Sequence, residues 1–163
     1  LGLSKSTIGC IAALCLLAEG CINLALTGAL MDRAGRKAVG LPALALMACA
    51  YGAVPLVGCA RSLVLVGLVY SAGNGLSGGI VQALAADVTP RQGQGQFLGA
   101  WKTVTVQGGL WFPALLGFLS EAAGSLDVAA VALAVVTAAT ALWLAVAVRE
   151  TAPEVAFWGG SAP

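Results

Sequence analysis

The chain has 163 residues, of which 60% are hydrophobic and only 9% are charged, and its formal net charge is +1. A soluble domain carries about 25% charged residues, so this chain has too little polar surface for a water-soluble fold. The small net charge also offers no basic face for nucleic acid. We therefore expect an integral membrane protein that contacts the lipid bilayer and has no nucleic-acid partner.

Five apolar segments are long enough to cross a membrane, which takes about 20 helical residues. The sequence predicts an all-α, polytopic bundle of five transmembrane helices in a single domain, over residues 7–30, 39–58, 62–86, 96–120 and 126–148. Pro42 falls in the first turn of the second predicted helix, where its missing N–H costs little. Pro113 is interior to the fourth and should kink it. Ser62 and Ser125 are placed to cap the third and fifth helices.

The distribution of Lys and Arg predicts the orientation of the chain, because cytoplasmic loops are enriched in these residues. If the first loop lies inside, six cations share its side and two lie opposite. The N-terminus is then outside and the C-terminus cytoplasmic. The inside cations are Arg33, Arg36, Lys37, Arg91, Lys102 and Arg149, and the outside ones are Lys5 and Arg61.

The residue types exclude much of enzyme chemistry. Histidine is absent, which removes Ser-His and Cys-His nucleophile pairs and His-ligated metal sites. The five cysteines form no CxxC pair and lie in or beside apolar runs, so we interpret them as small side chains packed among helices. We expect no catalytic residues, no cofactor and no metal.

Small residues follow one face of the third predicted helix. They recur every four residues, which is the spacing that lets another helix backbone approach closely. This stripe consists of Gly67, Ser71, Gly75, Gly79 and Ala83.

Polar residues at membrane depth are the candidates for a solute or proton site. Glu19 lies near the centre of the first helix, on one face with Cys15, Asn23 and Thr27. Buried carboxylates are costly and normally face a cavity or a partner, so Glu19 is a candidate proton-coupling or substrate-cation site, or a permanently protonated, hydrogen-bonded residue. The other candidates are Asn74 in the third helix and Lys102 and Gln107 in the fourth. Either these groups share a central cavity, or they only form hydrogen bonds between helices that hold the bundle together. The Lys102 side chain can also extend to the cytoplasmic membrane surface.

The first loop is the most specific feature of the sequence. Gly28 would let the first helix end approach a neighbour, and Gly35 would permit a left-handed backbone turn, with positive φ. The cations of the loop can neutralise the carbonyl ends of neighbouring helices. Asp87 lies near the C-terminal end of the third helix, where the helix dipole opposes a negative charge. We therefore expect it to pair with Arg33 or Arg36, so that the loop acts as a latch.

This loop resembles the signature of the major facilitator superfamily, G-x-L-x-D-R-x-G-R-K/R. The matching positions are Gly28, Leu30, Asp32, Arg33, Gly35, Arg36 and Lys37. The second inside loop is similar to a family pattern of drug-efflux-like members. It matches at Asp87, Pro90, Gly95, Gly99 and Trp101 and departs from it at Gln94 and Lys102.

The resemblance implies a secondary, alternating-access carrier of a small solute, often coupled to protons, whose Asp and Arg signature residues form the cytoplasmic gate. It also implies two six-helix halves. We interpret the chain as helices 8–12 of a twelve-helix transporter that lacks its other half, with helices 2–6 as the alternative. A second possible function is a non-transporting membrane interaction or assembly protein that retains part of the fold.

Overall fold

The computed structural model describes residues 2–147, and it describes residues 108–110, 112 and 113 by their backbone alone. Arg149 and the predicted kink at Pro113 therefore lie outside the described residues and side chains. All of the regular structure described is helical, which confirms the predicted all-α class. The elements are α1 (Lys5–Ile22), the π-helix η1 (Asn23–Thr27), α2 (Gly28–Ala34), α3 (Arg36–Ala53), the 3-10 turn η2 (Val54–Leu56), α4 (Ala60–Val88), α5 (Gln94–Ala123) and α6 (Leu126–Ala147).

Four helical stretches are long and apolar enough to cross a membrane. They are Lys5–Ala34, Arg36–Leu56, Ala60–Val88 and Leu126–Ala147. Helix α5 has 30 residues, and the apolar helix described within it is Ala114–Ala123. Four of the five predicted spans thus meet the criterion, and the span predicted over residues 96–120 stays a prediction.

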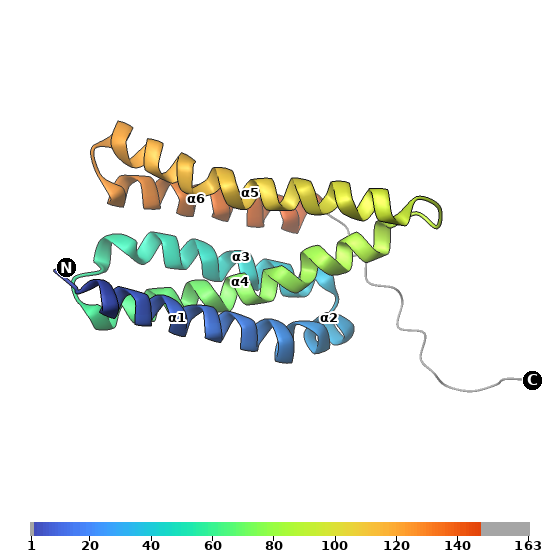
Figure 1. Cartoon of the computed structure of the whole chain (residues 1–163), viewed down its shortest axis with the longest axis horizontal. Helices are drawn as coiled ribbons and strands as arrows, with labels where there is room; N and C mark the ends of the chain where they lie inside the picture. The colour runs from blue at the N-terminus through green and yellow to red at the C-terminus, as the bar shows by residue number, and fades with distance from the viewer. Residues whose placement is uncertain (1, 148–163) are drawn as a thin grey trace, which may run out of the picture.

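The helices run side by side along the long axis of the molecule (Figure 1). Helix α3 packs against α4 and α6, α4 packs against α1 and η1, and α5 packs mainly on α6. The core between them is built from small side chains such as Ala43, Ala50, Ala85 and Ala129. Because lipid gives no hydrophobic drive between helices, small residues that allow close backbone approach stabilise the contacts. Large apolar side chains lie outward instead, and Leu24 is 90% exposed.

Two local predictions at helix starts were wrong for the same reason, namely that the helices begin earlier than expected. Helix α3 starts at Arg36, so Pro42 lies inside the helix rather than in its first turn, and one backbone hydrogen bond is lost. Helix α4 starts at Ala60 with Cys59 as its N-cap, so Ser62 is the third helical residue. The prediction for Ser125 is confirmed, because its Oγ accepts a hydrogen bond from the Asp127 N–H at 3.1 Å.

Candidate functional site

Helices α2 and α3 are joined by one residue, Gly35. Its backbone has φ 90° and ψ 164°, and it ends α2 and begins α3 at once. This region of backbone space is open essentially to glycine alone. The predicted positive φ is confirmed, in an extended mirror-image conformation rather than a left-handed helical one. The sharp reversal places the next two residues, Arg36 and Lys37, at the start of α3.

Arg36 pairs with Asp87 at the end of α4. The Arg36 Nη2 donates a hydrogen bond to the Asp87 Oδ1 at 2.9 Å, and the Arg36 Nε lies 2.6 Å from the Asp87 Oδ2. The two side chains are 16% and 33% exposed, so the pair is partly shielded from water. Asp87 is one of the last residues of α4, where the helix dipole repels a carboxylate and a cation is needed. The predicted pairing of Asp87 with an arginine of the first loop is confirmed for Arg36.

Lys37 contacts a third helix. Its Nζ donates a hydrogen bond to the main-chain carbonyl of Ala145 at 2.6 Å. Ala145 lies in the last turn of α6, where carbonyl groups lack partners within the helix and a cation is favourable. The start of α3 is therefore tied by two adjacent cations to the ends of α4 and α6, at the end of the bundle where Figure 1 places α2.

The other charged residues of the loop are placed differently. Asp32 and Arg33 are exposed, and neither side chain forms an ion pair or hydrogen bond with a described residue. The predicted close packing at Gly28 is wrong: a Cβ there would have no described atom within 4 Å. The residue before it, Thr27, is the one that faces α4, because adjacent helical residues point in different directions.

The small-residue stripe of α4 receives α1 and η1. A Cβ at Gly67 would lie 2.7 Å from the Cys15 Sγ, and one at Gly75 would lie 2.7 Å from the Glu19 carbonyl oxygen. Near the other end of this interface, a Cβ at Gly78 would lie 2.9 Å from the Asn23 amide nitrogen. The distances at Gly67 and Gly75 confirm that the stripe allows another helix to approach closely.

Thr27 joins the two helices where α1 widens into the π-helix η1. Its Oγ1 lies 3.1 Å from the Gly75 carbonyl oxygen and 3.3 Å from the Ile22 carbonyl oxygen, with geometry for donation to both. The Thr27 side chain is completely buried. The sequence places Thr27 and Cys15 on one helical face with Glu19. Both side chains pack against α4, where the glycines opposite them, Gly79 and Gly67, leave room.

The sequence matches the profile of the Major Facilitator Superfamily over residues 1–161. The chain belongs to this superfamily. It is an integral, multi-pass membrane protein and a membrane transporter of the major facilitator superfamily, whose environment is lipid and whose cargo is a small-molecule solute. Neither the curated proteins nor the solved structures give a match.

The remaining candidate residues of this superfamily transporter lie on different helices. Glu19 is half-buried on α1, and Asn74 is half-buried on α4. Asn23, Lys102 and Gln107 are exposed. Among the described residues, no hydrogen bond or ion pair joins the side chains of these five. Their predicted convergence on one cavity therefore stays a prediction, with Gln107 and Lys102 carried by α5, which packs mainly on α6.

The prediction that loop cations neutralise the carbonyl ends of neighbouring helices is confirmed for Lys37, although the sequence did not identify α6 as the partner. Sequence reasoning missed the role of Thr27 at the π-helix. A threonine four residues after a polar residue and opposite a glycine-rich helix was the available signal, since threonine hydroxyls bond to backbone carbonyls within membranes.

Proposed function

We propose that this superfamily member is a secondary carrier that moves a small solute by alternating access, with protons as the candidate coupling ion and no covalent chemistry. The Arg36–Asp87 ion pair carries this proposal. A carrier needs contacts that stabilise one conformation and break in the other. The pair fits that need because it joins the ends of two different spans and is only partly shielded from water.

The expected size of this effect suits a gate. A hydrogen bond to a charged group contributes about 1.5–3 kcal/mol, which changes the ratio of two conformations about 10- to 150-fold. That is enough to bias the transporter toward a closed end without locking it there. The Lys37 hydrogen bond to the Ala145 carbonyl would reinforce the same conformation. Under the predicted orientation, this closed end faces the cytoplasm.

Glu19 is the proposed proton site. Its side chain is half-buried in a membrane-spanning helix and forms no ion pair or hydrogen bond with a described residue. Ionisable residues within membrane-spanning helices mark ion, proton or substrate pathways. Asn23, Asn74, Lys102 and Gln107 are proposed solute contacts, in a pathway completed by the helices of the other half. The second-loop pattern favours the drug-efflux type.

The proposal is tested by transport in proteoliposomes of the complete protein. A panel of solutes that includes amphiphilic cationic drugs is presented with and without a pH gradient. We expect at least one solute to move faster than in empty liposomes and to respond to the gradient. Glu19→Gln should abolish the response to the gradient. Gln82→Glu, which adds a carboxylate on the exposed part of α4, serves as the control for altered charge. Unchanged flux and unchanged pH dependence in Glu19→Gln would remove the proposed role of Glu19.

A further inference from the structure

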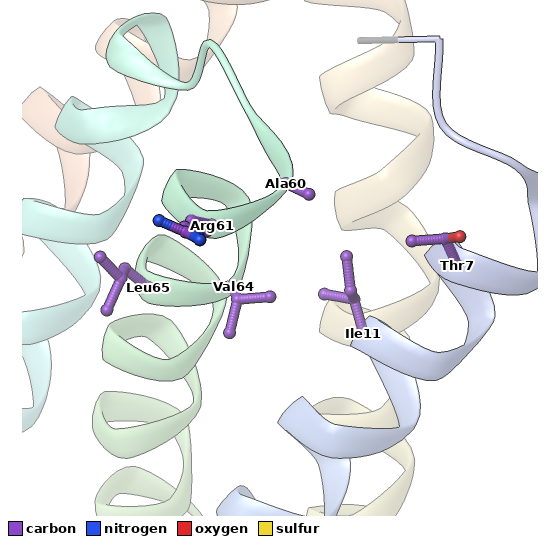
Figure 2. Close-up of a pocket in the computed structure, with 6 residues that line it drawn as sticks. All are labelled: Thr7, Ile11, Ala60, Arg61, Val64 and Leu65. Atoms are coloured by element: carbon purple, nitrogen blue, oxygen red, sulfur yellow. The ribbon is translucent and has the colours of Figure 1, made fainter.

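An apolar groove lies at the end of the bundle opposite the α2–α3 junction. It has a volume of about 500 Å³ and lies between the first turns of α1 and α4. Figure 2 shows lining residues of α1 on one side and lining residues of α4 on the other. The lining residues are Thr7, Ile11, Ala60, Arg61, Val64 and Leu65. The groove is open to the surface, and its carbon-rich walls suit an acyl chain.

One charged residue borders this groove. Arg61 is exposed, and its side chain forms no ion pair or hydrogen bond with a described residue. The acidic residues at the same end, Glu121 and Asp127, do not pair with it. Lys5 begins α1 close by in the chain. The positive ends of the α1 and α4 helix dipoles also lie at this end, so the mouth of the groove attracts negative charge.

We propose that this groove binds an anionic phospholipid, with its phosphate at Arg61 and an acyl chain along Ile11, Val64 and Leu65. Two observations favour lipid over other occupants. The groove lies at the ends of helices that cross the bilayer, where phospholipid headgroups and acyl chains meet. An apolar wall with a cation at its mouth also matches the two parts of an anionic phospholipid and neither a purely polar solute nor a neutral apolar one. The site is independent of the proposed transport cycle.

The experiment is native mass spectrometry of the full chain titrated with phosphatidylglycerol or phosphatidylcholine of identical acyl chains. One cation near a lipid phosphate strengthens binding about fivefold, so we expect phosphatidylglycerol to bind about five times more tightly. Arg61→Gln should remove this preference and Arg61→Lys should retain it. Arg91→Gln, which removes an exposed cation of the loop between α4 and α5, should leave it unchanged. Val64→Trp should weaken binding of both lipids.

Four outcomes would overturn the proposal. Equal affinity for the two lipids, or an unchanged preference in Arg61→Gln, would exclude recognition of the net negative charge of the headgroup by Arg61. Displacement of phosphatidylglycerol by inorganic phosphate would show a free-anion site instead of a lipid site. Failure to retain either lipid would show that another part of the protein covers the groove.

Discussion

Single residues at the two ends of the bundle have unlike electrostatic surroundings. At one end, Asp87 is held against Arg36 with two close contacts. At the other, the Cys59 thiol is exposed at the start of α4 with the Ser62 Oγ 3.5 Å from its sulfur. Hydrogen bonds from Ser62 lower the pKa of the Cys59 thiol below its ordinary value, and the bond from the Ser62 side chain has the largest effect. The interpretation of all five cysteines as packed residues is therefore wrong; Cys15 is half-buried against α4, and the other four are exposed.

The Arg36–Asp87 pair predicts a charge-exchange result. Asp87→Arg alone places like charges together and should reduce flux of the complete transporter at least tenfold, since it removes a contact worth about 1.5–3 kcal/mol. Combining it with Arg36→Asp restores an opposite-charge pair and should recover part of the flux. Asp127→Asn, at the other end of the bundle, is the matched control and should transport normally. A double variant no more active than Asp87→Arg would contradict a direct role for the pair.

The lowered pKa of Cys59 predicts an early rise of thiol reactivity with pH. Thiolate is the reactive form, so the alkylation rate of Cys59 should increase at lower pH than that of an ordinary thiol. Ser62→Ala should shift this increase to higher pH, because it removes the largest cause. The measurement is the rate of iodoacetamide labelling of the Cys59 peptide as a function of pH. The same chain denatured in detergent is the reference, and identical profiles in both states would contradict the assignment.

Among the elements, the α1–α4 contact depends on glycine at particular positions. The four-residue spacing was enough to predict which face of α4 receives a neighbour. It was not enough to predict the π-helix, because η1 is accompanied by a hydrogen bond from Thr27 to Gly75 across 48 positions in the chain, and local periodicity carries no information about such a partner. The position of Gly28 at the predicted end of the first helix likewise suggested a packing role that the structure does not show.

This difference between glycines predicts opposite effects of alanine on stability. In Gly75→Ala, the new Cβ would lie 2.7 Å from the Glu19 carbonyl oxygen and 3.2 Å from the Ile22 side chain. Such overpacking should lower the free energy of unfolding by about 1–3 kcal/mol. Gly28→Ala is the matched control, since its Cβ meets no described atom within 4 Å, and it should be neutral or raise stability by about 0.5–1 kcal/mol. Thermal unfolding in detergent, followed by tryptophan fluorescence, measures both. Equal melting temperatures would show that α1 and α4 do not pack at Gly75.

At the level of the whole molecule, the sequence was sufficient for the class and for the approximate helix ends. Apolar length alone predicts helices, and the continuous helical stretches Lys5–Ala34, Arg36–Leu56 and Ala60–Val88 end within four residues of the predicted bounds. The pairing of Asp87 with the first loop followed from the helix dipole and a shared membrane face. Relative placement of Glu19, Asn74 and Gln107 could not be derived this way, because depth along a helix does not determine the direction in which a side chain points.

The excess of Lys and Arg on one side predicts how the transporter lies in its membrane. Cys59 should react with a membrane-impermeant maleimide added outside intact cells. In Arg33→Cys, the new thiol on the exposed loop should react only after the cells are permeabilised. Arg33 forms no ion pair or hydrogen bond with a described residue, so this substitution should leave the fold intact. The reverse labelling pattern would show that the N-terminus is cytoplasmic.

The one-residue connection at Gly35 has a consequence for the order of events in a transport cycle. Arg36 and Lys37 are consecutive at the start of α3, yet they hold different helices, α4 and α6. Neighbouring residues of a helix move as a rigid body, so tilting the first turn of α3 stretches both attachments in the same step. The ends of α3, α4 and α6 should thus separate in a single concerted transition. A displacement of α6 should be transmitted to Asp87 through the first turn of α3, without a rearrangement in the interior of the bundle.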